Sequence, residues 1–193
     1  MAERQTAPLR LFYVRHGETA WSLTRQHTGR TDLPLTTTGE AEARALLPWL
    51  SHLKFSHVFT SPLQRARRTC VLAGLGDAAE IEPDLAEWNY GDYEGLTTAD
   101  IRRSRPGWYL FRDGVPNGET IEQVADRARR VVERATAVEG DAALFAHGHI
   151  LRILAACWLG LPPVDAKLLA LSTASVSTLG YEHETRVITR WNL

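Results

Sequence analysis

The chain alternates short apolar runs with amphipathic segments, a pattern that predicts strands and helices following one another. Residues 9–14, 57–60 and 142–147 are apolar enough to be covered on both faces, as the strands of a parallel sheet are. Residues 175–182 and 185–192 alternate apolar and polar positions on either side of a polar turn. These two runs predict an antiparallel hairpin at a sheet edge.

Helix signals follow the first two strands. Thr37 and Glu40 have capping-box spacing, which predicts a helix from about residue 38, and Pro48 should kink or end it. After the second strand, Pro62 suits the first turn of a further helix that contains Arg65. Each of these helices is expected to pack on a face of the sheet.

The clearest helix pattern begins near Thr120, and its charged residues, Arg127 among them, are expected to face water. Its apolar stripe comprises Ile121, Val124, Ala125, Ala128, Val131, Val132 and Ala135. A last helix is expected over residues 149–160, where Gly160 and a proline pair end it.

Strands that alternate with helices predict an α/β domain with a mostly parallel central sheet, helices on both faces and an antiparallel edge hairpin. A length of 193 residues and an apolar content of 44% fit a single domain, residues 1–193. Residues 1–8 are expected to form a flexible tail. The edge hairpin could pair between two copies of the chain, which leaves a homodimer open.

The composition excludes several classes of partner. A formal net charge of -1 gives no broad basic surface for nucleic acid. The sequence has no apolar leader and no stretch long enough to span a bilayer, so a cytoplasmic protein without membrane contact is expected. Cys70 and Cys157 lie among apolar neighbours, which indicates reduced cysteines that pack in the core.

Polar side chains follow each of the three predicted parallel strands. Arg15 and His16 follow the first, residues 61–65 follow the second, and residues 147–149 follow the third. Ligands of α/β sheets bind at the carboxyl ends of the strands, so these side chains are expected to meet there.

Such a group of side chains could hold a phosphoryl group. Arg15 and Arg65 can donate forked, charge-assisted hydrogen bonds, and the start of the helix after Ser61 adds partial positive charge. A neutral His16 would attack phosphorus and form a covalent intermediate, while His147 neutralises the equatorial oxygens. This chemistry requires no metal ion and no cofactor.

The leaving oxygen needs a proton, and a carboxylic acid that stays protonated near neutral pH would supply it. Glu87 lies in a half-apolar loop and is the main candidate, with Asp92 and Glu94 as competitors. Gly17 and Gly148 are expected to let the backbone approach the phosphate closely.

Two neighbouring groups need a separate interpretation. His147 and His149 form a pair that can indicate a metal site, but no Asp or Glu with ligand spacing accompanies them. We therefore expect His149 to cap a helix or support the site. Arg67 and Arg68 point away from Arg65 around a helix, so only one of the three should enter the pocket.

Four segments in order carry a family resemblance: RHGET at 15–19, TSPLQRA at 60–66, LAEWNYGDYEG at 85–95 and FAHGHILR at 145–152. Together they resemble the histidine phosphatase superfamily, in its phosphoglycerate-mutase-like branch. The resemblance implies a three-layer α/β/α fold and a phosphohistidine at His16. It also implies a phosphate pocket of Arg15, Arg65 and His147, and it favours Glu87 as the proton donor.

One position departs from the family pattern. Ser22 stands where the family often has an Asn that touches the phosphate, so a single hydroxyl is expected to contact the phosphate there. Backbone groups of Thr28 and Gly29 could hold substrate hydroxyls, or this segment could be a plain surface loop. The loop sequences look most like a subgroup of acid phosphatases and sedoheptulose-1,7-bisphosphatase-like enzymes.

The sequence therefore predicts a metal-independent phosphomonoesterase for small phosphorylated metabolites, such as sugar phosphates or bisphosphates. The chain looks shorter than cofactor-dependent mutases, whose extra segment shuts water out of the site, and this favours hydrolysis. Two alternatives remain, a phosphoglycerate mutase and a non-catalytic phosphate-binding module.

Overall fold

The computed structural model describes residues 9–137 and 139–193, and the tail predicted at residues 1–8 lies outside the described residues. Six strands form one sheet in the order β3-β2-β4-β1-β5-β6. The strands are β1 (Leu11–Arg15), β2 (His57–Thr60), β3 (Ala79–Ile81), β4 (Ala142–Ala146), β5 (Val176–Glu182) and β6 (Thr185–Arg190). Strands β3, β2, β4 and β1 are parallel neighbours, whereas β5 pairs antiparallel with both β1 and β6. The predicted α/β fold with an antiparallel edge hairpin is confirmed.

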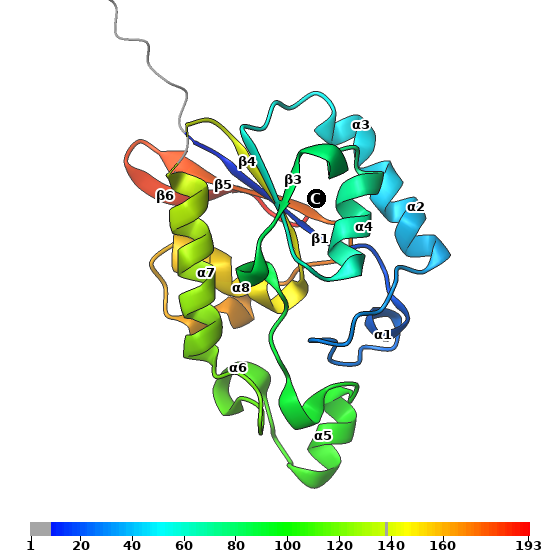
Figure 1. The fold of residues 1–193 in the computed structure, drawn as a ribbon. Coiled ribbons are helices and arrows are strands. Elements are labelled where there is room, and N and C mark those ends of the chain that lie inside the picture. Colours follow the sequence, from blue (N-terminus) through cyan, green and yellow to red (C-terminus); the bar gives the residue numbers. More distant parts are fainter. Residues whose placement is uncertain (1–8, 138) are drawn as a thin grey trace, which may run out of the picture.

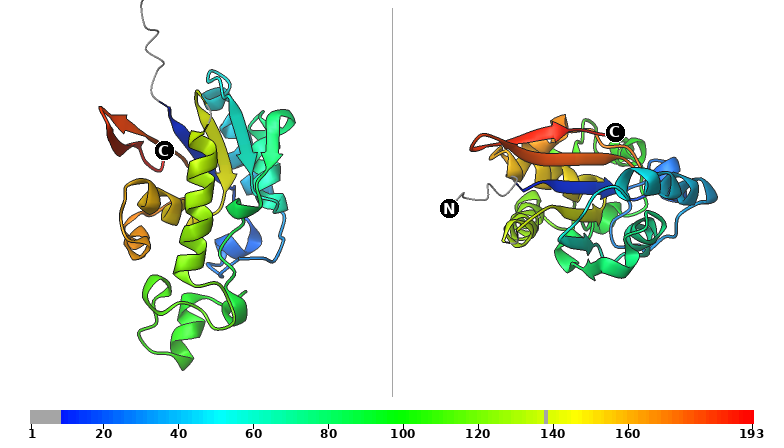
Figure 2. Two further views of the ribbon diagram at one scale, coloured as in Figure 1. Left: turned by 60° about the vertical axis from the view of Figure 1, so that its left-hand side comes forward. Right: turned by 90° about the horizontal axis from the view of Figure 1, so that it is seen from above.

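Helices cover both faces of this sheet (Figures 1 and 2). They are α1 (Ala20–Leu23), α2 (Thr37–Ala45), α3 (Leu47–Leu50), α4 (Gln64–Leu72), α5 (Thr98–Ser104), α6 (Leu110–Asp113), α7 (Ile121–Thr136) and α8 (Gly148–Trp158). Short 3-10 turns are η1 (Gly76–Ala78), η2 (Pro83–Leu85), η3 (Gly91–Tyr93) and η4 (Pro163–Leu168). None of the described helices is long and apolar enough to cross a membrane.

The side chains of β1 show how the layers form, because successive residues of a strand point to opposite faces. Leu11 and Tyr13 pack in the larger hydrophobic cluster, with α7 and α8. Phe12 and Val14 pack in the smaller cluster, with residues of α3 and α4. One strand thus contributes to two cores, and the result is the three-layer α/β/α arrangement in which α7 and α4 flank the sheet in Figure 1.

Three local predictions were wrong in detail. Helix α2 is capped by the side chain of Thr36, which accepts from Gly39 N, so the cap lies one residue before Thr37. Helix α4 begins at Gln64, so Pro62 precedes it instead of occupying its first turn. Arg127 faces inward on α7 and is only 8% exposed, because Glu119 and backbone carbonyls satisfy its guanidinium.

The segment after β1 crosses the start of α2 at very close range. A Cβ added at Gly17 would lie 2.3 Å from the carbonyl oxygen of Gly39, and one added at Gly39 would lie 2.1 Å from that of Glu18. Gly17 therefore permits a backbone crossing, and its predicted role of leaving room for the phosphate stays a prediction. The crossing fixes the residues that follow β1 against α2.

Gly17→Ala is expected to lower the free energy of unfolding by about 2 kcal/mol, because the new methyl group must displace backbone atoms. Urea unfolding followed by circular dichroism measures this loss. Gly107→Ala is the matched control: it strains a residue with φ of +75° but has no atom within 4 Å, so about 1 kcal/mol is expected. Equal losses in the two variants would contradict the close crossing.

Candidate active site

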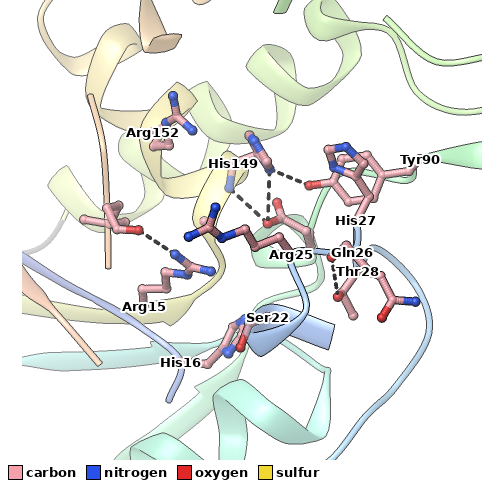
Figure 3. Close-up of a pocket in the computed structure, with 13 residues that line it drawn as sticks. Arg15, His16, Ser22, Arg25, Gln26, His27, Thr28, Tyr90, His149 and Arg152 are labelled. Carbon is pink, nitrogen blue, oxygen red and sulfur yellow. Dashed lines mark hydrogen bonds and ion pairs between the residues drawn. The ribbon is translucent and has the colours of Figure 1, made fainter. Parts of the chain in front are cut away.

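A cavity of about 290 Å³ opens where β1 and β4 end (Figure 3). The predicted site residues that line it are Arg15, His16, Ser22, Thr28, Glu87 and Gly148. Its other lining residues are Arg25, Gln26, His27, Tyr90, His149, Arg152 and Leu171. Three predicted residues, Arg65, His147 and Gly29, do not line the cavity.

His16 is held in one orientation at the end of β1. Its backbone N–H donates to Ala146 O at 3.0 Å, and its carbonyl accepts from Ala174 N at 3.1 Å. In the ring, Nδ1 lies 2.7 Å from Gly17 O, and since a carbonyl only accepts, Nδ1 carries the proton. The lone pair of Nε2 is then free, as a nucleophile requires.

The charge state of His16 also suits a nucleophile. Burial, together with the Arg65 and Arg15 guanidinium groups, lowers the pKa of His16 well below its usual range. Because the neutral form exists above the pKa, this shift extends the neutral, nucleophilic range toward acidic pH.

In the free protein, His16 is therefore expected to stay neutral at about pH 6, where an ordinary imidazole is largely protonated. NMR titration of the histidine Cε1–H signals measures this, with free histidine in the same buffer as the reference. His16→Ala assigns the signal. A His16 signal that titrates near pH 6.5 would contradict the role of burial and of the two arginines.

Arg15 presents an incompletely satisfied guanidinium to the cavity. Its Nη1 donates to Leu171 O, while its Nε is buried without a hydrogen-bond partner among residues 9–137 and 139–193. A buried N–H without a partner is costly, so an anion bound here would satisfy it. Gly148 lies beside this group, since a Cβ added there would contact Arg15 Cζ at 3.5 Å.

Arg65 and His147 form a buried layer behind His16. Arg65 Nε donates to His147 Nδ1 at 3.0 Å, so the ring proton of His147 is on Nε2, which lies 2.7 Å from Ser61 Oγ. The rings of His16 and His147 are 5.1 Å apart. Burial, Arg65 and His16 lower the pKa of His147 well below its usual range, which keeps it neutral. Donation from His147 to a phosphoryl oxygen needs Nε2–H to leave Ser61, and this role stays a prediction.

Most donors of Arg65 hold the loop that borders the cavity. Its Nη1 donates to Thr31 O at 2.9 Å, and its Nη2 donates to Thr28 O at 3.2 Å and to Gly29 O at 2.9 Å. Since a guanidinium has five N–H groups, one remains for another acceptor. Its predicted contact with the phosphate is therefore limited to one hydrogen bond in this arrangement.

Two amides at the start of α4 donate to acceptors within the protein, so the contribution of this helix start to phosphate binding stays a prediction. Gln64 N donates to Asp32 Oδ1 at 2.8 Å, and Leu63 N donates to Ser61 Oγ at 3.2 Å. The carboxylate of Asp32 offsets part of the positive charge of the helix start, because the first amides of a helix are the groups that carry its partial charge. The full positive charges that line the cavity are those of arginine side chains.

Glu87 enters the cavity from the loop after η2. Its Oε1 accepts from Trp88 N and Ile150 N, both at 2.9 Å, and among the described residues its Oε2 accepts only from His149 N, also at 2.9 Å. A carboxylate oxygen has two acceptor positions, so Oε2 retains one position that can carry a proton. This geometry suits a group that gives and takes a proton.

The competing carboxylates have other functions. Glu94 Oε1 accepts from Gly29 N at 2.8 Å and from Thr31 N at 3.0 Å, and Asp92 Oδ2 accepts from Asn117 Nδ2 at 2.9 Å. Neither lines the cavity. Among the candidates in this loop, the structure thus brings only Glu87 to the site.

The contacts of Ser22, in α1, and of Thr28 and Gly29, in the loop after it, differ from those predicted. Ser22 lines the cavity, but its hydroxyl donates to Thr19 O at 3.0 Å within a capping box, so it has no free proton for a phosphate. Thr28 O and Gly29 O accept from Arg65, and Gly29 N donates to Glu94. Gly29 therefore has both backbone groups engaged and lies outside the cavity, whereas contact of a substrate hydroxyl with the backbone N–H of Thr28 stays a prediction.

Several residues of the site were not predicted. Arg25, Gln26 and His27 belong to the same polar segment as the RHGET motif, but nothing in their spacing shows that they point inward. His149 was expected to support the site, and it both lines the cavity and shares a 2.5 Å hydrogen bond with the Tyr90 hydroxyl. Among residues 9–137 and 139–193, no three His, Cys, Asp or Glu side chains are grouped as a metal site.

The family model of the histidine phosphatase superfamily (branch 1) matches residues 11–193. The chain belongs to this superfamily. It is 42% identical over 183 residues to an acid phosphatase of Mycobacterium tuberculosis, covering 92% of this chain and 89% of that one. It is 40% identical over 184 residues to sedoheptulose 1,7-bisphosphatase of Saccharomyces cerevisiae, covering 79% of this chain and 68% of that one.

A solved structure from Mycobacterium tuberculosis superposes on this histidine phosphatase with a TM-score of 0.91 and 40% identity, covering 95% of this chain and 97% of that one. The predicted family, fold and phosphatase class are thereby confirmed. The roles of individual residues rest on the geometry described above.

Proposed function

We propose that this histidine phosphatase is a metal-independent phosphomonoesterase that hydrolyses small phosphorylated metabolites, such as sugar phosphates or bisphosphates, through a phosphohistidine at His16. One observation carries the proposal. The free Nε2 lone pair of His16, the unpartnered Nε of Arg15 and the open acceptor position on Glu87 Oε2 all belong to side chains that line one cavity of the described structure.

The first step transfers the phosphoryl group to the protein. His16 Nε2 forms a bond to phosphorus as the bond from phosphorus to the leaving oxygen breaks, and Glu87 gives its proton to that oxygen. Nδ1–H keeps its hydrogen bond to Gly17 O, which orients the ring and stabilises the positive charge of the phosphorylated imidazole. Arg15 stabilises the charge on the phosphoryl oxygens.

The second step releases phosphate. Glu87, now a carboxylate, takes a proton from water as the water oxygen bonds to phosphorus. The P–N bond breaks, its electron pair returns to His16 Nε2, and inorganic phosphate leaves. Glu87 is again protonated, so both residues return to their starting states.

The names of the relatives support hydrolysis of phosphate esters, since one is an acid phosphatase and another a sedoheptulose bisphosphatase. A phosphoglycerate mutase would use the same phosphohistidine but return the phosphoryl group to a second hydroxyl. The cytoplasmic location and the homodimer stay predictions from the sequence.

Release of inorganic phosphate from a panel of metabolites in excess EDTA tests this function. The panel contains sedoheptulose and fructose bisphosphates, 3-phosphoglycerate and p-nitrophenyl phosphate. Turnover in EDTA is expected with at least one sugar phosphate. Interconversion of 2- and 3-phosphoglycerate that depends on bisphosphoglycerate, with little phosphate release, would instead show a mutase. Binding of these compounds without any turnover would show a non-catalytic module.

A further inference from the structure

A second cavity, of about 460 Å³, lies between the segment around α3 and the β5–β6 hairpin, and we call it the hairpin groove. Its volume is within the range of small-molecule sites. Among the described residues, none lines both this groove and the catalytic cavity, so the proposed reaction does not explain it. The lining residues that matter most are Phe12, Trp49, Leu53, Thr178, Thr189 and Arg190.

Strand pairing places the floor of the groove on one face of the sheet. Phe12 of β1 pairs with Thr178 of β5, and Thr178 pairs in turn with Arg190 of β6. Directly opposite residues of antiparallel strands point to the same face. Since Phe12 packs in the smaller hydrophobic cluster together with Leu50 of α3, Thr178 and Arg190 also point to the α3 side of the sheet.

A bulge in β6 adds Thr189 to the same face. Thr178 pairs with Arg190 but Leu179 pairs with Ile188, so Thr189 is an extra residue in the ladder. Successive residues of a regular strand point to opposite faces, and a bulge changes the direction of a side chain. Two consecutive residues, Thr189 and Arg190, therefore both line the groove. The Thr189 hydroxyl donates to Thr178 O at 3.1 Å, which fixes the bulge.

The hydroxyl of Thr178 lacks a partner at the floor of the groove. Thr178 is 3% exposed, and its Oγ1 is buried without a hydrogen bond to residues 9–137 or 139–193. Most buried polar side-chain atoms are hydrogen-bonded, and one that is not costs stability. A ligand group that accepts from this hydroxyl would offset that cost. The floor of the groove is thus suited to a polar group of a ligand.

The charged side chains of the groove favour an anion. Its ionisable lining residues are Arg10, His52 and Arg190, and no Asp or Glu is among the described residues that line it. Arg10 is committed, because its Nη2 lies 2.5 Å from Asp141 Oδ2. Arg190 makes no ion pair and no side-chain hydrogen bond with the described residues. An anionic group beside Arg190 and the Thr178 hydroxyl would have both a counter-ion and a donor.

The side of the groove that α3 contributes is aromatic and apolar. Trp49 is 39% exposed, although the next residue, Leu50, is fully buried. Phe12 and Leu53 line the same groove. A planar ring that packs on the Trp49 indole would remove apolar area of both from water, and aromatic pairs gain further from their ring geometry.

We propose that the hairpin groove binds a small aromatic anion. Its ring packs on Trp49, and its negative group contacts Arg190 and the Thr178 hydroxyl. Aromatic carboxylates and nucleotides share this chemistry. The groove is separate from the catalytic cavity, so this inference does not depend on the proposed function.

Calorimetry on the whole protein tests the proposal with matched ligands. Indole-3-acetate is compared with indole and with acetate, and 3′,5′-cyclic AMP, which is a phosphodiester and not a phosphomonoester, is compared with adenosine. At least one of the two aromatic anions is expected to bind with a Kd below about 1 mM, at least about tenfold tighter than its fragments. Tighter binding of indole-3-acetate assigns a carboxylate, and tighter binding of cyclic AMP assigns a nucleotide. No saturable binding of either anion would overturn the proposal.

Variants of the groove locate the bound anion. Trp49→Leu removes the ring and Arg190→Met removes the charge, and each is expected to weaken binding at least about fivefold. Trp49→Phe keeps a ring and is expected to retain most of the affinity. Arg186→Met is the matched control for Arg190→Met, because Arg186 is an exposed arginine of the same strand outside the groove. Binding that neither Trp49→Leu nor Arg190→Met weakens would place the ligand elsewhere and overturn the proposal.

Thr178→Val separates a role in ligand binding from a role in the fold. Valine has nearly the same shape, and the hydroxyl that it removes has no partner among the described residues. The midpoint of thermal unfolding is therefore expected to stay unchanged or to rise, while the affinity for the aromatic anion falls at least about threefold. A lower midpoint with unchanged affinity would show that the hydroxyl serves the fold and would contradict its contact with the ligand.

Discussion

His16→Ala is expected to lower the rate of phosphate release by at least about a thousandfold, because removal of a nucleophile abolishes the covalent route. The other histidines of the cavity wall, His27 and His149, both pack against Tyr90, and His149 Nδ1 shares a hydrogen bond with the Tyr90 hydroxyl. The measurement is steady-state phosphate release from the best substrate of the panel, in EDTA.

The matched control for this variant is His52→Ala, since His52 is an exposed histidine away from the cavity. Thermal unfolding of His16→Ala checks that the fold is retained, because His16 is 5% exposed and its loss leaves a small void. A folded His16→Ala protein that keeps more than about a tenth of the wild-type rate would show that another group accepts the phosphoryl group.

Glu87→Gln is expected to lower the rate about a hundredfold or more for sugar phosphates, because general acid–base catalysis contributes on that scale. The loss should be much smaller for p-nitrophenyl phosphate, whose leaving group departs without a proton. The two substrates together separate proton donation from a general loss of structure, which would lower both rates alike.

Asp92→Asn, on the same loop, is the control for Glu87→Gln, because Asp92 does not line the cavity. Glutamine can keep the acceptor contacts of one oxygen but places an amide N–H₂ near one of the backbone donors of Glu87. A thermal shift measures that structural cost. Equal losses with both substrates would contradict the role of Glu87 as the acid.

The carboxylate of Glu87 is placed by a second layer that the sequence did not reveal. Arg127 Nη1 donates to Ala86 O at 2.9 Å, and its Nε donates to Glu119 Oε1 at 2.8 Å. Glu119 Oε2 in turn accepts from Asn89 N at 2.8 Å. The Arg127–Glu119 ion pair thus holds the loop on both sides of Glu87, which explains why Arg127 is buried on a face of α7 expected to be exposed.

The sequence predicts the sheet and the place of the site because both depend on local patterns. The sequences of β1, β2 and β4 are apolar throughout, which predicts buried parallel strands. Parallel strands have their carboxyl ends at one edge of the sheet, and His16 and His147 follow two neighbouring strands there. The packing of Gly17 on Gly39 and the capping of α4 by Asp32 depend on contacts between distant segments. Residue spacing carries no signal for such contacts.

Arg25 shows the same limit within the site. Its segment could be recognised as polar and close to the RHGET motif, but its inward direction depends on a φ of +61° and on contacts with the segment around Leu96. Arg65 has a structural role in addition to the one that the sequence predicted. The family resemblance places it at the phosphate, whereas its contacts with Thr28, Gly29 and Thr31 show that it also holds the loop.

The most direct test of the account is a rapid-quench experiment that traps the phosphoenzyme. The protein is mixed with excess substrate in EDTA and quenched, and the phosphorylated peptide is located by mass spectrometry under conditions that preserve phosphoramidates. Covalent transfer predicts one phosphoryl group on His16 that forms at least as fast as phosphate is released and is absent from His16→Ala. A phosphoryl group on any other residue, or rapid turnover with no phosphoenzyme while His16→Ala remains active, would contradict it.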